Sequence, residues 1–117
     1  MAKVPPLYEK KDCTQLSTQL DLNQCACGNR DAADKTLNDT YARVVAIMPN
    51  QNAKIKLRNA QRVWIKKRDQ VCLSKVGSRK DSGTIWELDM CSCLEKITAD
   101  RIIELNKMYP PSLEQLD

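Results

Sequence analysis

Cysteine content constrains this chain more than any other feature. The 117 residues include six cysteines, Cys13, Cys25, Cys27, Cys72, Cys91 and Cys93. An even number of cysteines in one small domain is typical of a disulfide framework formed in an oxidising compartment. We therefore expect a periplasmic or secreted protein, present here as the mature form with a start methionine in place of its native signal peptide, since no apolar segment follows Met1.

Composition argues against several classes of function. The absence of histidine removes Ser-His-Asp and Cys-His catalysis and every histidine-containing zinc site. Aromatic residues make up only 4% of the chain. The net charge is only +4, and the basic residues are mixed with acidic ones, so we expect no nucleic-acid partner. No apolar run approaches the ~20 residues of a membrane span. The sequence predicts no enzyme, no cofactor and no metal, and it leaves the oligomeric state undetermined.

Three segments have the apolar periodicity of helices, and none of useful length alternates like a strand. The first helix is predicted to begin between Thr14 and Thr18 and to end near Ile47, the second to cover about 53–75, and the third to run from Thr84 to the prolines at 110 and 111. Short connections between them predict an all-α antiparallel three-helix bundle, or four helices if Gly28 breaks the first.

The predicted domain boundaries follow the same signals. An extended N-terminal segment is expected at 1–12, a disulfide-bonded helical domain at 13–109 and a short tail at 110–117. At the start of the third helix, Thr84 and Glu87 have the spacing of a capping box.

Cysteine levels along such a bundle suggest a connectivity. Cys13 and Cys72 share the top of the first two helices, whereas Cys25 lies ~18 Å below Cys13 if the first helix is continuous. Bridged Cα atoms lie within ~7 Å of each other, which would forbid a bond between Cys13 and Cys25. The predicted bridges are therefore Cys13–Cys72 and Cys25–Cys93, with Cys27–Cys91 as the third.

Two alternatives remain open at this point. Residues two apart on a helix point about 200° apart, so Cys25 and Cys27 cannot both face the third helix unless the backbone unwinds near Gly28. The pairing Cys25–Cys91 with Cys27–Cys93 fits the levels as well. A Cys₄ zinc site is also conceivable, although zinc ligands are usually separated by two to four residues.

Charged side chains fall on or beside the predicted apolar stripes. Arg68 borders the stripe of the second helix and Arg101 lies on that of the third, and a charge there requires a partner. We interpret these side chains as a structural polar network that comprises Asp34, Asn38, Gln61, Arg68, Asp69 and Arg101. Trp64 lies on the stripe of the second helix and is predicted to be a core residue.

Four blocks in order along the chain carry a family resemblance. Residues 57–72 read LRNAQRVWIKKRDQVC, residues 18–26 read TQLDLNQCA, residues 33–41 read ADKTLNDTY and residues 93–101 read CLEKITADR. The block at 57–72 resembles the signature L-R-x-A-Q-R-x-W-x-x-x-R-D-x-x-C of the lysozyme inhibitor LprI-like domain family, and the other three resemble the blocks that flank this signature in the family. The resemblance covers about residues 12–106.

This resemblance implies a secreted or periplasmic bacterial helical domain that inhibits lysozyme. Four of the cysteines match the usual family positions, whereas Cys27 and Cys91 are additional, which supports pairing them with each other. The turn before the third helix departs from the family pattern, since it reads DSGT at 81–84 instead of a Gly-Gly-Ser-like sequence.

The predicted function is that of a binding protein that occludes the cleft of a lysozyme or a related peptidoglycan hydrolase. Helix faces are occupied by the core, so the loop at 77–83 is the expected recognition surface. Its candidate target-binding residues are Arg79, Lys80, Asp81 and Ser82. The alternatives are an immunity protein against a cell-wall-degrading toxin, and a structural or envelope protein without a hydrolase target.

Overall fold

The structure is a computed structural model that describes residues 6–112, with backbone only for Asp81 and Ser82. Residues 1–5 and 113–117 of the predicted terminal segments lie outside the described residues. The described part contains four helices and no strand, in the order α1 (Gln19–Ala46), α2 (Gln51–Val76), α3 (Arg79–Ser82) and α4 (Ile85–Met108). The predicted all-α fold of three long helices is confirmed, and α1 passes through Gly28 unbroken.

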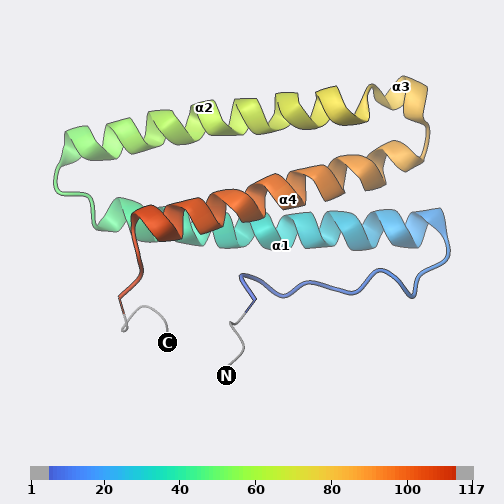
Figure 1. Cartoon of the computed structure of the whole chain (residues 1–117), viewed down its shortest axis with the longest axis horizontal. Coiled ribbons are helices and arrows are strands. Elements are labelled where there is room, and N and C mark those ends of the chain that lie inside the picture. The colour runs from blue at the N-terminus through green and yellow to red at the C-terminus, as the bar shows by residue number, and fades with distance from the viewer. Residues whose placement is uncertain (1–5, 113–117) are drawn as a thin grey trace.

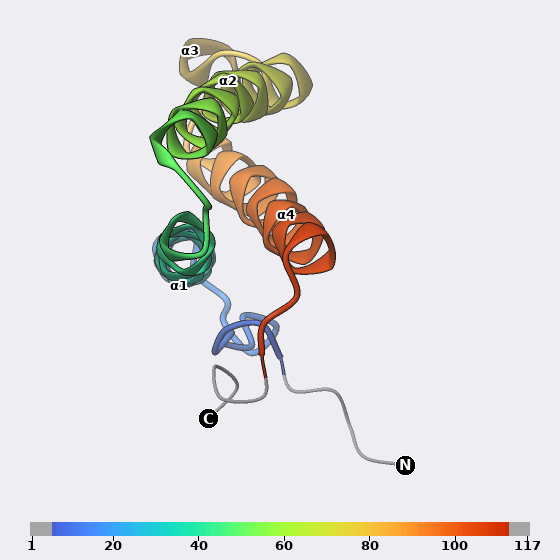
Figure 2. The same ribbon diagram turned by 90° about the vertical axis from the view of Figure 1, so that its left-hand side faces the viewer.

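Helices α1 and α4 lie side by side and run in the same direction, while α2 runs the opposite way and packs on α4 (Figure 1). The end-on view in Figure 2 shows α2 on one side of the α1–α4 pair and the N-terminal segment on the other. A cluster of Leu37, Ile102 and Leu105 forms the core between α1 and α4, and Trp64 of α2 packs against it. This arrangement leaves α2 partly separated from α1.

Side-chain caps fix where the first two long helices begin. The hydroxyl of Thr18 accepts a hydrogen bond from the Asp21 amide at 3.1 Å, and the Asn50 side chain accepts one from the Ala53 amide at 2.9 Å. Each satisfies an N–H group that has no partner within its helix. The N-cap of α1 therefore places residues 6–17 outside the helix.

The predicted capping box at Thr84 is wrong. Thr84 has helical backbone angles, φ −69° and ψ −23°, and its side chain makes no capping hydrogen bond. A capping side chain requires an extended N-cap residue, and here Gly83 makes the turn with a φ of 62°. The Thr84 carbonyl instead accepts a hydrogen bond from the Asn23 side chain at 3.0 Å, which ties the start of α4 to α1.

Residues 6–17, which we call the strap, run back along the α1–α4 pair. The Asn29 side chain accepts a hydrogen bond from the Lys11 amide at 2.8 Å and donates one to the Lys11 carbonyl at 3.0 Å. Glu95 of α4 accepts a 2.6 Å hydrogen bond from the Tyr8 hydroxyl and forms an ion pair with Lys10 at 3.1 Å. Burial and the Glu95 carboxylate raise the pKa of Tyr8. The strap is thus bound to both helices.

Two of the three predicted disulfides are wrong. The structure pairs Cys13 with Cys25 and Cys72 with Cys93, whereas Cys27–Cys91 is as predicted. The exclusion of Cys13–Cys25 assumed that both residues lie in one helix, but Cys13 lies in the strap, which brings the two Cα atoms to 5.9 Å. The zinc alternative is also wrong, because all six thiols are consumed in disulfides.

The 200° divergence within each Cys-x-Cys pair explains the connectivity. In α1, Cys25 bonds to the strap and Cys27 bonds to α4. In α4, Cys91 bonds to α1 and Cys93 bonds to α2. Neighbouring cysteines on one helix therefore reach different partners, and no unwinding at Gly28 is needed.

Partial reduction distinguishes this connectivity from the level-matched one. After digestion with trypsin and Asp-N protease, Cys13 lies in peptide 12–20, both Cys25 and Cys27 in 21–30, and Cys72 in 69–75. We expect mass spectrometry of the partially reduced digest to detect peptide 12–20 bonded to 21–30. Detection of peptide 12–20 bonded to 69–75 would contradict the structure.

Candidate functional site

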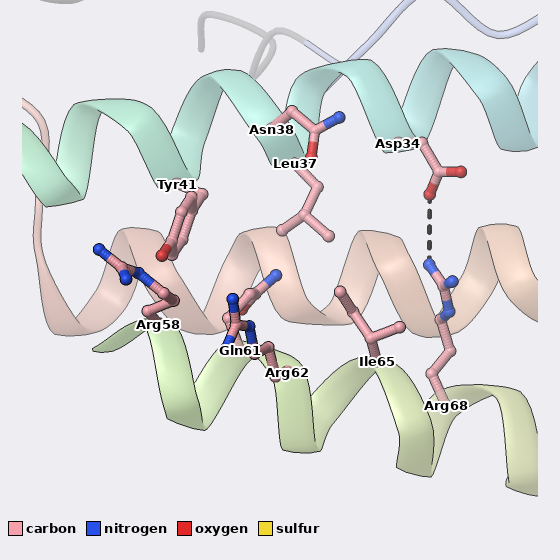
Figure 3. Close-up of a pocket in the computed structure, with 9 residues that line it drawn as sticks. All are labelled: Asp34, Leu37, Asn38, Tyr41, Arg58, Gln61, Arg62, Ile65 and Arg68. Carbon is pink, nitrogen blue, oxygen red and sulfur yellow. Dashed lines mark hydrogen bonds and ion pairs between the residues drawn. The ribbon is translucent and has the colours of Figure 1, made fainter. Parts of the chain in front are cut away.

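A groove lies between α1 and α2, with α4 passing behind it (Figure 3). It has a volume of about 370 Å³. We call it the α1–α2 groove, and its lining residues are Asp34, Leu37, Asn38, Tyr41, Arg58, Gln61, Arg62, Ile65 and Arg68. It exists because α2 packs on α4 more than on α1.

Arg68 closes one end of the α1–α2 groove. Its guanidinium forms ion pairs with Asp34 of α1 at 3.3 Å and with the adjacent Asp69 at 3.0 Å. It also donates to the hydroxyl of Thr98 on α4 at 3.3 Å, and it lies 5.3 Å from the centre of the Trp64 ring. Arg68 therefore joins all three long helices, and its charge is compensated within the protein.

Arg101 has one partner from the expected polar network, Gln61, and one from outside it, Glu104. Its side chain is buried on α4 and donates to Gln61 at 3.1 Å and to Glu104 one turn further along α4. The Trp64 ring centre lies 5.8 Å from its guanidinium. Among the six residues of the expected polar network, Asn38 is the one whose side chain makes no hydrogen bond to the other five in the described part of the chain; it is exposed and lines the groove.

Arg58 and Arg62 differ from Arg68 in having no partner. Both are exposed, and within residues 6–112 neither guanidinium has a carboxylate within 4 Å or a hydrogen-bond acceptor. In the sequence analysis, Arg58 and Arg62 occur only within the block at 57–72 that resembles the family signature, and neither was a candidate site residue. No acidic residue lies three or four positions from either arginine on α2, but the same is true of Arg68, so spacing along the helix does not distinguish the paired arginine from the unpaired ones.

The predicted recognition loop contains the one-turn helix α3. Gly77 ends α2 with a φ of 82°, and its carbonyl accepts a 2.9 Å hydrogen bond from the Trp86 indole. Arg79 lies with its guanidinium 5.9 Å from the centre of the Trp86 ring, and Lys80 is exposed beside it. Asp81 and Ser82 belong to α3, and their side chains lie outside the described part. We call residues 77–84 the α2–α4 connection.

A second hollow, of about 430 Å³, adjoins this connection. Arg79 and Trp86 line it together with Met90 and Leu94 of α4, and Arg68 lines both this hollow and the α1–α2 groove. Arginines of α2 and α3 therefore line both hollows, namely Arg58, Arg62 and Arg68 of α2 and Arg79 of α3. Guanidinium groups in this setting can bind carboxylates through paired hydrogen bonds.

Neither a group of metal-binding side chains nor a membrane-spanning helix occurs among residues 6–112. Within 6–112 no three His, Cys, Asp or Glu side chains gather into a group that could hold a metal ion. No helix in that range combines the length and the apolar character needed to cross a bilayer. The described residues form a disulfide-bonded helical scaffold with arginines lining two surface hollows.

Comparison with known proteins places the chain in a family. The family model described as lysozyme inhibitor LprI matches residues 10–105. An uncharacterised protein of Rhizobium meliloti (strain 1021) is 33% identical over 109 residues, an alignment that covers 83% of this chain and 78% of that protein. No solved structure matches significantly. With matching over most of its length, the chain belongs to the lysozyme inhibitor LprI family.

Proposed function

We propose that this protein is a periplasmic or secreted inhibitor that binds a lysozyme-type peptidoglycan hydrolase and occludes its cleft. Membership of an inhibitor family supports this proposal, and the three disulfides fit an extracellular or periplasmic location. The protein acts by binding, without a cofactor. Its disulfides restrict the unfolded chain and so stabilise the folded state that presents the recognition surface.

The observation that carries the proposal is the presentation of Arg79 at one end of the bundle. The Trp86 ring supports its guanidinium, and the Trp86 indole is in turn bonded to Gly77 at 2.9 Å. Glycosidase clefts contain a pair of carboxylates, which are natural partners for a guanidinium and an ammonium group. Arg79 and Lys80 supply these two groups, with Asp81 and Ser82 beside them.

Paired substitutions test the role of the α2–α4 connection. Arg79→Ala with Lys80→Ala is expected to raise the inhibition constant by at least about 100-fold, because each of the two charge-assisted hydrogen bonds that are lost is worth about 1.5–3 kcal/mol. The measurement is inhibition of a panel of lysozymes by the oxidised protein. Both side chains are exposed, so the melting temperature should barely change.

A matched control removes the same charge elsewhere. Lys66→Ala with Lys67→Ala changes two exposed cations of α2 that line neither hollow, and it should leave inhibition unchanged. Arg101→Ala should lower stability with little direct effect on binding. Normal inhibition by the Arg79/Lys80 variant would move the contact surface away from this connection.

One observation favours a second candidate. The net charge of +4 opposes long-range attraction to a basic lysozyme. A cell-wall-degrading toxin need not be basic, so an immunity protein would avoid this cost. Co-purification from periplasm with an acidic hydrolase, together with no inhibition across the lysozyme panel, would favour the immunity function.

A further inference from the structure

We propose that the α1–α2 groove is a binding site for an acidic peptide segment of a protein partner, in which two carboxylates bind Arg58 and Arg62. This site is separate from the α2–α4 connection, and the inference does not depend on the identity of any hydrolase target. It rests on unpaired charge, on the spacing of the two arginines and on the side chains of the groove walls.

Unpaired charge is the first argument. The groove is lined by three arginines and one aspartate, and the aspartate, Asp34, is bound by Arg68. Asp69, the only acidic residue of α2, is bound by Arg68 as well. The guanidinium groups of Arg58 and Arg62 are therefore left without a counter-ion among the described residues. A guanidinium binds a carboxylate in a two-pronged geometry that a lysine cannot reproduce.

Spacing is the second argument. Arg58 and Arg62 lie four residues apart on α2, which separates them by about 6 Å along the helix axis. Side chains two apart on an extended peptide point the same way and are separated by about 6.6–6.8 Å. Two acidic residues at alternate positions of an extended segment can therefore meet the two arginines together.

The walls of the groove suit a peptide. On the α1 side, Tyr41 points toward Arg58, and Asn38 offers a side-chain amide with no hydrogen bond in the described structure (Figure 3). An amide of this kind can pair with a peptide backbone. Ile65, 39% exposed, supplies an apolar contact on the α2 side. A concave site between two helices fits a single extended chain better than it fits the flat surface of a bilayer.

The test measures binding of a synthetic probe to the oxidised full chain. The probe is a fluorescein-labelled ten-residue peptide with Glu at alternate positions, and its reference is the same peptide with Gln in those positions. Arg58→Gln with Arg62→Gln should weaken binding of the Glu peptide by at least about 30-fold in fluorescence anisotropy, with each single variant contributing about 5- to 10-fold. The Gln peptide should bind no variant tightly.

A control of equal charge separates the groove from diffuse attraction. Lys66→Gln with Lys67→Gln should weaken the Glu peptide by less than about threefold, since exposed charges away from the contact act mainly at long range. Arginine modification by phenylglyoxal provides a second readout in the unaltered chain. The Glu peptide should protect Arg58 and Arg62, but not Arg79, from modification.

Several results would overturn the proposal. One is an equal loss in the Lys66/Lys67 variant, which would show attraction to α2 as a whole. Another is the absence of peptide binding or of protection at Arg58 and Arg62. Tighter binding of tripolyphosphate or of phosphatidylglycerol vesicles through the same two arginines would identify a phosphate ligand instead of a peptide. Loss of inhibition in the Arg79/Lys80 variant would leave these outcomes unaffected.

Discussion

Replacing Cys27 and Cys91 by alanine is expected to lower the free energy of unfolding by about 4 kcal/mol, the largest effect of any disulfide in this chain. The bond closes the longest loop, with a sequence separation of 64. In the chain-entropy account, a longer closed loop restricts the unfolded ensemble more. The bond also joins α1 to α4, the pair that forms most of the core. Urea unfolding followed by circular dichroism measures the change.

The strap disulfide provides the matched control. Cys13→Ala with Cys25→Ala removes a bond with a sequence separation of only 12, and a loss of about 3 kcal/mol is expected. A loss equal to or larger than that of the Cys27/Cys91 variant would contradict the ranking. It would mean that the strap contacts of Tyr8 and Lys11 depend on the bond more strongly than the loop-closure account allows.

Trp64→Ala is expected to cost about 3 kcal/mol, at the low end of the range for removal of a large core aromatic side chain because Trp64 is half-buried. The ring packs against the Leu37 cluster and lies against the guanidinium groups of both Arg68 and Arg101. Removing it takes away apolar contact and two cation–π contacts together. The melting temperature and the urea midpoint should both fall.

Trp64→Phe separates the contribution of an aromatic face from the contribution of the larger volume of the tryptophan side chain. Phenylalanine retains an aromatic face for the two arginines and should recover more than half of the loss. Unchanged stability in Trp64→Ala, combined with lost target binding, would show that Trp64 is a ligand platform instead of a core residue. The α1–α2 groove should also change in Trp64→Ala, because Trp64 helps to hold α2 on α4.

Local sequence signals predicted the helices well. Apolar spacing, the proline after α1 and the prolines after α4 act within a few residues, so the sequence contains all the information they need. The side-chain cap at Asn50 acts over the same short range. The Arg68 partners Asp34 and Asp69 were also among those named from the sequence, because a charge beside an apolar stripe requires a compensating carboxylate.

Prediction failed where the outcome depends on how separate segments pack. The pairing of Cys13 with Cys25 requires the strap to fold back and bind Asn29, and no pattern within residues 6–17 specifies that contact. Arg101 meets Gln61, a member of the expected network, because of the way α2 lies on α4. Its second partner, Glu104, lies three residues further along α4, a local spacing that the sequence contains and that was not used. The α1–α2 groove follows from the same packing.

Residue spacing thus determined the helices, the fold class and the requirement that neighbouring cysteines face different ways. Tertiary structure alone decided which segments those cysteines meet and which arginines remain unpaired. The physical reason is the distance along the sequence over which each interaction acts. Helix periodicity and capping are satisfied within one or two turns, whereas disulfide partners and charge compensation depend on segments that are distant in sequence and brought together only by packing.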